Sequence, residues 1–260
     1  TIVWAAIIGF AVMMFIAMHA GMWMWVAAVY FGLILLFSIT YSRVRAEAGS
    51  PMVWLFPISQ QWDMMVYSIG SAPYQRGTGY GNMTIFALFF WLARGYFPTM
   101  SAYQMEGLKI ADEANIHRRT MIWWMIAALV IGLAGAYYVH LQAYYSFGAN
   151  VLEGGSTEGG ARVRAAVRAW DMVSSWITAA VAPDTQRTSA AAVGFGVTLL
   201  LVLLRSVFLR FPLHPLGYVM MASYGSPIWG PFFLVWIIKS TVLKVGGMGL
   251  YRQLIPFFLG

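Results

Sequence analysis

The chain contains no cysteine, which excludes disulfides, thiolate zinc sites, iron–sulfur clusters and cysteine nucleophiles. It also has little charge, because only 10% of its 260 residues are Asp, Glu, Lys or Arg while 60% are hydrophobic. A soluble domain carries about 25% charged residues, so this composition could not cover a surface in water. The sequence therefore predicts an integral membrane protein.

Catalytic motifs are absent as well. The sequence holds no HExxH, GxSxG, CxxC or Walker A lysine. Its His residues do not cluster, and His19 and His140 each stand alone in an apolar run. We expect no enzymatic activity, no metal site and no cofactor. The 16 Lys and Arg exceed the 9 Asp and Glu, but in a membrane protein such an excess serves orientation and lipid headgroups. We therefore expect lipids, and no nucleic acid, among the partners.

Long apolar runs predict the membrane spans. Residues 2–41 carry no charge, and about 20 apolar residues suffice for one span, so they predict two helices with a tight break at residues 19–21. Further spans are expected over residues 82–92, 120–145 and 189–204. The predicted fold class is all-α, a polytopic membrane helix bundle with about five to seven spans.

Polar segments separate these runs. Charged loops are expected over residues 42–51 and 239–252, and a polar helix outside the bilayer is expected over residues 94–119. Residues 146–187 are expected to form an extramembrane part, a Gly-rich loop followed by an amphipathic helix that lies in the membrane interface. The apolar residues expected to face inward are Val163, Val167, Trp170 and Ile177, and the basic residues expected to face headgroups or water are Arg162, Arg164 and Arg168.

The run 214–238 is apolar but interrupted by Gly and Pro, which predicts a broken or re-entrant helix with a discontinuity between Ser223 and Pro231. A break inside a bilayer frees backbone carbonyls, and these are tolerated only where protein or a water-filled cavity satisfies them. The residues that we expect to line a substrate or ion site there are Ser223, Tyr224, Gly225 and Ser226. The alternative is a kinked packing helix whose carbonyls are covered by neighbours.

Asp63 is the most informative single residue. It stands between Trp62 and Met64 in an apolar segment, and a carboxylate exposed to lipid there would be costly. We expect it to lie away from lipid, within reach of Gln60, Tyr67 or a neighbouring helix, and to line a substrate or ion pathway. An interfacial position is the alternative.

Glu106 and Lys109 lie on the predicted polar helix, with Glu113 on the same face. One interpretation is a solvated helix with exposed ion pairs. The other is that Glu106 or Lys109 points into a substrate vestibule.

Several stretches resemble a known family. They are SRVRAEAG at residues 42–49, MEGLKIA at 105–111 and RFPLHPLG at 210–217. They are similar to the C-terminal half of an uncharacterised bacterial membrane family allied to the oligopeptide transporter superfamily. The resemblance implies, by analogy, secondary transport of small peptides or metal chelates across the bacterial inner membrane. It also implies that residues 1–260 form a single transmembrane domain, the C-terminal part of a longer chain.

Two functions are left open. The first is a secondary transporter with a small-molecule or ion substrate. The second is a non-transporting structural subunit of a larger membrane complex, in which the Arg-rich helix and the many Trp and Tyr dock partners and lipids. A homo-oligomer is compatible with both.

Overall fold

The structure, a computed structural model, describes residues 2–49, 60–75, 80–93, 99–148, 151, 161–208, 211–221 and 229–259. Over these residues the chain is helical and forms no strand, which confirms the all-α prediction. It divides into two compact units, Thr1–Gly194 and Phe195–Gly260.

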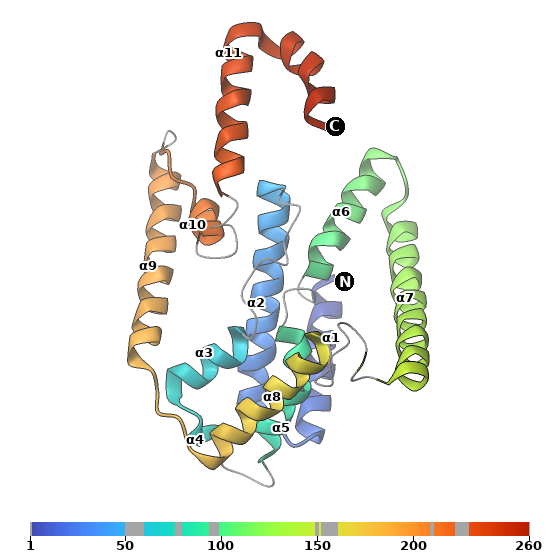
Figure 1. Ribbon diagram of the computed structural model, residues 1–260, viewed down its shortest axis with the longest axis vertical. Coiled ribbons are helices and arrows are strands. Elements are labelled where there is room, and N and C mark those ends of the chain that lie inside the picture. The colour runs from blue at the N-terminus through green and yellow to red at the C-terminus, as the bar shows by residue number, and fades with distance from the viewer. Residues whose placement is uncertain are drawn as a thin grey trace. The chain divides into compact units, whose positions relative to one another are not determined.

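The first unit comprises α1 (Ile2–His19), α2 (Met24–Ala48), α3 (Gln60–Ile69), α4 (Ala72–Gln75), α5 (Gly81–Leu88), the 3-10 helix η3 (Phe90–Ala93), α6 (Thr99–Glu113), α7 (Arg118–Phe147), α8 (Ala161–Thr178) and the first half of α9 (Thr185–Val207) (Figure 1). The second unit comprises the rest of α9, α10 (Pro215–Met221) and α11 (Trp229–Leu259).

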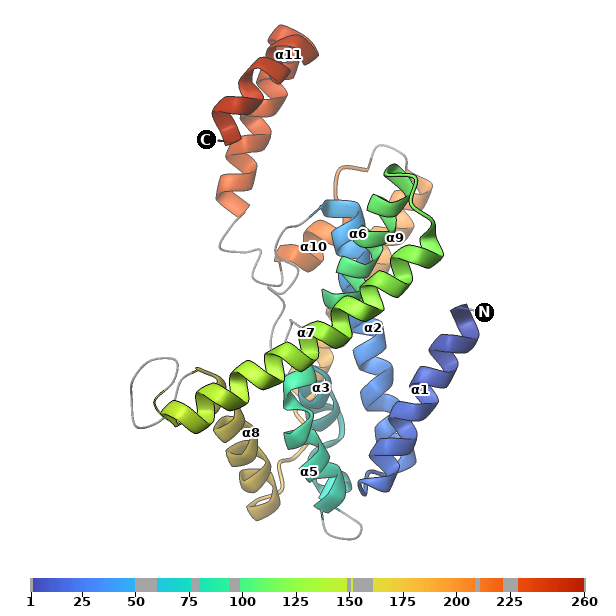
Figure 2. The ribbon, with the colours of Figure 1, turned by 90° about the vertical axis from the view of Figure 1, so that its right-hand side faces the viewer.

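The predicted break between the first two helices is confirmed. α1 ends at His19, and α1 and α2 then lie side by side as a hairpin (Figure 2). The predicted charged loop over residues 42–51 is wrong up to Ala48, because α2 continues through it. Arg43 pairs with Glu47 one turn on at 2.6 Å, and Gly49 ends the helix with φ 61°, a conformation that glycine adopts without strain.

Asn82 fastens this hairpin to the rest of the unit. Its side-chain Oδ1 accepts a hydrogen bond of 2.8 Å from the backbone N–H of Trp23, and its Nδ2 donates to the carbonyl of Tyr74 at 3.2 Å. The side chain is buried. The backbones of Gly21 and Gly81 touch here, where a Cβ on Gly81 would overlap the Gly21 carbonyl. Only glycine fits this approach.

An aromatic core lies where α2, α3, α5 and α8 meet. The largest fully buried side chains include Trp62, Tyr30, Tyr74 and Phe86. The ring of Phe86 lies 5.5 Å from those of both Tyr30 and Tyr74, and the ring of Trp62 lies 6.4 Å from it. Such offset and edge-on arrangements add about 0.5–1.5 kcal/mol per pair beyond area burial. The core therefore fixes α3 against its neighbours.

The span predicted over residues 82–92 is not formed. α5 has 8 residues and is followed by the 3-10 helix η3 of 4 residues, so neither approaches the length of about 20 residues that a crossing requires. Ile85, Phe86 and Ala87 are buried within the unit instead. Their apolar character serves the core and not a lipid-facing surface.

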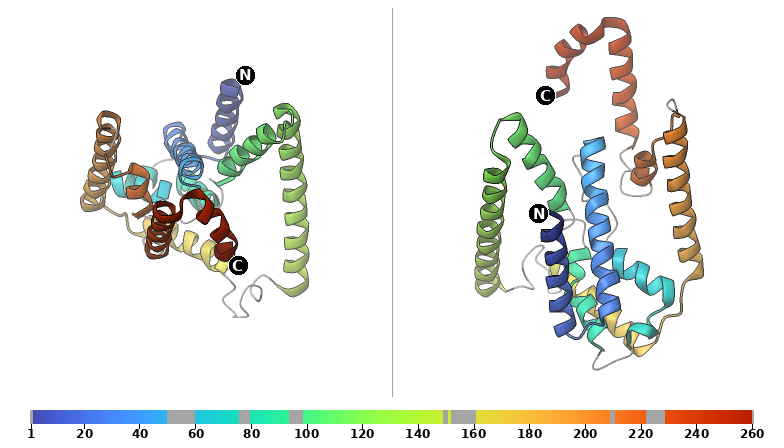
Figure 3. Two further views of the ribbon diagram at one scale, coloured as in Figure 1. Left: turned by 90° about the horizontal axis from the view of Figure 1, so that it is seen from above. Right: turned by 180° about the vertical axis from the view of Figure 1, so that it is seen from behind.

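Among the described residues, four helices are long and apolar enough to cross a membrane, namely Met24–Glu47, Arg118–Phe147, Thr185–Val207 and Trp229–Pro256. The second and third contain the spans predicted over residues 120–145 and 189–204. In the views of Figure 3, α6 and α7 lie next to each other and meet at a sharp corner. The most apolar stretches of α7 and α11 have no buried residue, and in α9 only Leu201 is buried.

The predicted orientation of α8 needs correction. Val167 and Trp170 were expected inward, but their side chains are about half exposed, at 50% and 47%. The buried residues are Ala169, Val173 and Trp176. Ile177 packs against the core as predicted, so the stripe that faces the core is displaced around the helix only at Val167 and Trp170. Arg164 and Arg168 are exposed, as predicted.

In the second unit, the expected basic loop over residues 239–252 is wrong, because α11 runs through it. Gly247 interrupts this helix with φ 60° and ψ −160°, and Figure 1 shows the resulting bend. Non-glycine residues scarcely reach this backbone conformation. The discontinuity predicted between Ser223 and Pro231 lies mostly outside the described residues. Pro231 itself lies in the first turn of α11, where proline is tolerated.

Candidate functional site

The best candidate site lies on α3, where three consecutive residues carry buried polar atoms without a hydrogen-bond partner among the described residues. These atoms are Gln61 Nε2, Trp62 Nε1 and Asp63 Oδ1. Gln61 and Trp62 are almost completely buried, with 2% and 1% of their surface exposed. An unpaired buried donor or acceptor costs about 1–3 kcal/mol. The side chain of Gln61 interacts with the Tyr30 hydroxyl, so Trp62 Nε1 and Asp63 Oδ1 are the clearest cases. Buried polar groups of this kind are typical of positions where a bound ligand or water supplies the missing hydrogen bond.

Asp63 is half-buried, and its surroundings are electrostatically mixed. Burial raises the pKa of its carboxyl from 3.8 to about 6, while the positive charges of Arg187 and Arg168 oppose that rise. Neither arginine lies within ion-pair distance of Asp63 in the described residues. The carboxylate is thus held near two cations without being paired to either.

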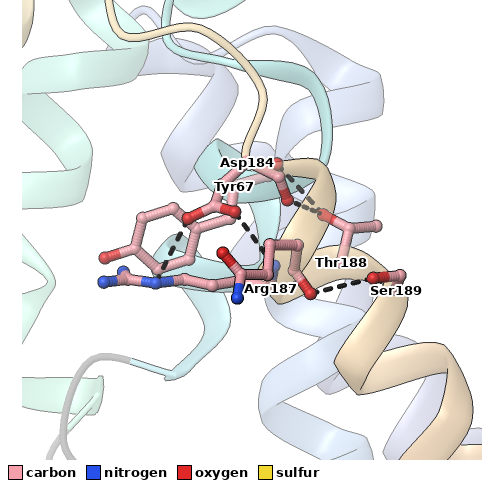
Figure 4. Close-up of polar contacts among 6 residues, drawn as sticks. Tyr67, Asp184, Arg187, Thr188 and Ser189 are labelled. Carbon is pink, nitrogen blue, oxygen red and sulfur yellow. Dashed lines mark hydrogen bonds and ion pairs between the residues drawn. The ribbon is translucent and has the colours of Figure 1, made fainter.

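The start of α9 is fastened to the last turn of α3, as Figure 4 shows. The backbone carbonyl of Tyr67 accepts hydrogen bonds from the N–H of Asp184 at 2.9 Å and from the hydroxyl of Thr188 at 3.2 Å. The guanidinium carbon of Arg187 lies 4.4 Å from the centre of the Tyr67 ring, a cation–π contact. These contacts explain why Arg187, distant in sequence, comes close to Asp63.

Asp184 organises this junction. Its Oδ1 accepts a hydrogen bond of 2.9 Å from the backbone N–H of Arg187, which is an N-cap for α9. Its Oδ2 lies 3.2 Å from Arg187 Nε. The side chain of Arg187 therefore lies between Asp184 and Tyr67.

The connector between α8 and α9, residues 179–184, is bound by residues at the junction of α3 and α4. Ser71 and Val181 exchange two hydrogen bonds, from Ser71 N–H to the Val181 carbonyl at 3.0 Å and from Val181 N–H to Ser71 Oγ at 2.9 Å. The side-chain amide of Gln75 donates to the carbonyl of Trp176. Gly70 has φ 81°, and a Cβ there would approach the Val181 carbonyl to 2.8 Å. The connector and α3 thus form one interlocked element.

The structure places Glu106 and Lys109 in a different environment from Asp63. Glu106 Oε1 lies 2.5 Å from Arg45 Nε on α2, with the arginine side chain 18% exposed. Lys109 pairs with Glu113 at 3.3 Å, and both side chains are largely exposed. These ion pairs match the interpretation of a charged helix with paired residues. A vestibule role for Glu106 or Lys109 stays a prediction.

A hydroxyl cluster accompanies the Arg45–Glu106 pair at the contact between α2 and α6. Ser42 Oγ and Ser101 Oγ lie 2.7 Å apart, and Ser38 Oγ and Ser101 Oγ are separated by the same distance. Hydroxyl contacts of this kind join helices in membrane proteins. Sequence analysis did not predict this cluster, although Ser38 and Ser42 are one turn apart on a single apolar helix.

Other predicted site residues lie outside the described parts. Ser223, Tyr224, Gly225 and Ser226 are not described, and of Gln60 only the backbone, at the start of α3, is described. Among the described residues, no three His, Asp or Glu side chains come together in a way that could hold a metal ion.

Sequence reasoning missed Gln61, Arg168 and Arg187 as neighbours of the site. The signal available for Arg187 is its spacing from Asp184, which is typical of an N-cap at the start of an apolar helix. That spacing predicts where α9 begins, but nothing local predicts that this helix start lies against α3.

Comparisons with known proteins identify a family. The whole chain, residues 1–260, matches the model of DUF6785, described as a family of unknown function, and the chain belongs to that family. No curated protein and no solved structure matches the chain.

Proposed function

We propose that this member of the DUF6785 family is a secondary transporter of the bacterial inner membrane, moving a small peptide, a metal chelate or a comparable small solute. The single observation that carries the proposal is the set of unpartnered buried polar atoms on α3, centred on Asp63. In a chain with four candidate spans, an ionisable residue with such surroundings is by default a pathway residue.

The character of α3 supports this role. It has 10 residues, too few to cross a bilayer, and it packs against α2 and η3. Short helices at membrane depth are tolerated where they are enclosed by protein or line a cavity. The site predicted from the sequence at Ser223, Tyr224, Gly225 and Ser226 belongs to the second unit and stays a separate prediction.

Helix α8 supports the same picture as an interfacial element. Its outward side carries Val167 and Trp170 together with Arg164 and Arg168, a mixture of apolar and basic residues that suits the headgroup boundary. Because α8 also contributes Trp176 to the core beside Trp62, with ring centres 5.2 Å apart, its position is tied to α3.

The second candidate function is a structural subunit of a larger membrane complex. The observation that favours it is the surface of α7 and α11, whose most apolar stretches contain no buried residue, together with that of α9, where only Leu201 is buried. Exposed aromatic residues on α7 include Trp123, Trp124, Tyr137 and Tyr138. These surfaces can be covered by lipid in a transporter or by partner chains in a complex.

Uptake into proteoliposomes tests the first function. The whole protein is reconstituted, and uptake of labelled di- and tripeptides and of iron and nickel chelates is compared with that of Asp63→Asn and of Asp171→Asn. Asp171 is exposed on α8 and provides the same change of charge away from the buried site. We expect uptake of at least one substrate class, lost in Asp63→Asn and retained in Asp171→Asn.

Absence of uptake across both panels would contradict the transporter. Stoichiometric partner chains after purification in mild detergent would then favour the structural subunit. Uptake that is equal in the protein and in Asp63→Asn would retain transport but remove Asp63 from the pathway.

A further inference from the structure

We propose that the corner between α6 and α7 is a binding site for the phosphate headgroup of an anionic phospholipid, with Arg119 as its main cation. The proposal does not depend on transport. It rests on a depression of about 420 Å³ at this corner, lined by Ala111, Asp112, Asn115, Ile116, His117, Arg118 and Arg119.

Backbone hydrogen bonds and close packing hold the corner between α6 and α7. The N–H of Ile116 donates to the Ala111 carbonyl at 2.8 Å, and Asn115 adopts φ 57°, which together end α6 in a closed turn. Gly107 on α6 lets α7 come close, because a Cβ there would lie 3.1 Å from Met125 Sδ. A site that is already ordered loses less entropy on binding.

The two arginines of the depression have different tasks. Arg118 spans the turn with two hydrogen bonds to Asp112, of 2.7 and 2.8 Å. This pairing lowers the pKa of Asp112, so its carboxylate stays charged and stays bound to Arg118. The negative charge of Asp112 in the lining is therefore balanced by the positive charge of Arg118. Arg119 is exposed and makes no ion pair with the described residues, so its guanidinium is available to a phosphate.

The position along α7 indicates a lipid and not a soluble anion. α7 is a candidate span whose charged beginning is followed within about one turn by Trp123 and Trp124, exposed at 62% and 69%. Tryptophans of this kind mark the headgroup level of a bilayer. Ile116, 43% exposed, adds an apolar rim on the other side of the corner. A phosphate bound by Arg119 would thus carry its acyl chains along an apolar helix surface.

Lipid titration of the whole protein in detergent tests the site. Tryptophan fluorescence follows thermal unfolding while dioleoyl phosphatidylglycerol or dioleoyl phosphatidylcholine is added. We expect phosphatidylglycerol to raise the unfolding temperature more than phosphatidylcholine does. In Arg119→Gln the half-saturating concentration should rise about tenfold, which is the usual effect of losing one charge-assisted hydrogen bond. Arg119→Lys should retain most of the affinity.

The matched control is Arg43→Gln. Arg43 is also an exposed arginine, with 68% of its side chain exposed, near the end of a candidate span, but it does not line the depression. It should leave the lipid titration unchanged. Equal loss in Arg43→Gln and Arg119→Gln would overturn the site, because it would show only a general effect of surface charge.

Two more outcomes would overturn the lipid assignment. One is an equal effect of the two lipids. The other is an equal stabilisation by inorganic phosphate, which would make the corner a site for soluble anions.

Should Arg119→Gln not fold, native mass spectrometry of the unmodified protein tests the proposal instead. Retention of phosphatidylglycerol over phosphatidylcholine at equal lipid concentration is expected, and equal retention refutes the proposal.

Discussion

Replacement of Asp63 by Asn should change how stability depends on pH. The pKa of the Asp63 carboxyl is raised by burial from 3.8 to about 6, with Arg187 and Arg168 opposing the rise. One pKa unit corresponds to about 1.36 kcal/mol, and with screening by solvent at this half-buried position the charged carboxylate costs the folded protein on the order of 1–2 kcal/mol. Asn has nearly the same shape and carries no charge, so Asp63→Asn removes this cost.

The direction of the effect follows from proton binding. Between pH 3.8 and about 6 the folded protein holds the Asp63 proton while the unfolded protein has released it. The folded state therefore binds more protons, and stability falls as the pH rises through this window. Below it both states are protonated, and above it both are charged, so the Asp63 contribution is constant at either end.

Thermal unfolding of the whole protein in detergent, followed by tryptophan fluorescence, measures the change. The gain in unfolding temperature of Asp63→Asn over the unmodified protein should be about 2–8 °C larger at pH 7.5 than at pH 4, at about 2–4 °C per kcal/mol for a chain of this size. Asp171→Asn, at an exposed position on α8, controls for the loss of one negative charge. A difference between Asp63→Asn and the unmodified protein that is the same at both pH values would refute the reasoning.

Three further predictions concern stability. Asn82→Ala removes both hydrogen bonds that join the α1–α2 turn to α4. Thermal unfolding should show a loss of about 1–3 kcal/mol for each buried group left unpaired. An unchanged unfolding temperature would contradict this role of Asn82. Glu106→Gln breaks the ion pair with Arg45. Because the Glu106 side chain is 40% exposed, the loss of folding stability should stay below about 1 kcal/mol. Lost uptake at unchanged stability would instead place Glu106 in a substrate vestibule. Gly247→Ala should lower folding stability by about 1–3 kcal/mol because Gly247 has a positive φ. Gly249→Ala is the control and should leave stability unchanged, because Gly249 has no positive φ and no atom within contact distance of an added Cβ. Equal effects of the two substitutions would show that the bend does not depend on Gly247.

Where a sequence signal is local, the sequence predicted the fold well. The apolar runs over residues 120–145 and 189–204 appear within α7 and α9, and the break at residues 19–21 separates α1 from α2. An uncharged run of about 20 residues has few alternatives to a helix in a bilayer, because every backbone polar group must be paired.

The predictions failed where a local signal had a different meaning. Charges over residues 42–48 and 239–252 suggested loops, yet both stretches are helical. Lys, Arg and Glu are good helix formers, so charge in a membrane protein marks where a helix leaves the apolar region and not where the helix ends. The apolar run at 82–92 was mistaken for a span because a buried core helix and a membrane helix share the same composition.

The neighbours of Asp63 could not be predicted from local pattern at all. Asp63 stood out because a carboxylate in an apolar segment is costly wherever it lies. Arg187 reaches it only because Asp184 caps α9 and the carbonyl of Tyr67 binds the beginning of that helix. Contacts between residues so far apart in sequence depend on how the helices pack, and helix packing is not encoded in the periodicity of either segment.

The two candidate functions differ most clearly in what they require of α3. A transport pathway needs polar groups that are shielded from lipid yet not permanently paired, because a solute must displace their partners as it passes. A structural subunit gains nothing from such groups, since a fully paired or apolar core would be more stable. In the described part of the chain, the buried polar atoms without partners are those of Gln61, Trp62 and Asp63. A structural subunit should therefore tolerate apolar replacements of Gln61 and Asp63 and become more stable, whereas a transporter with the same replacements should become more stable and lose uptake.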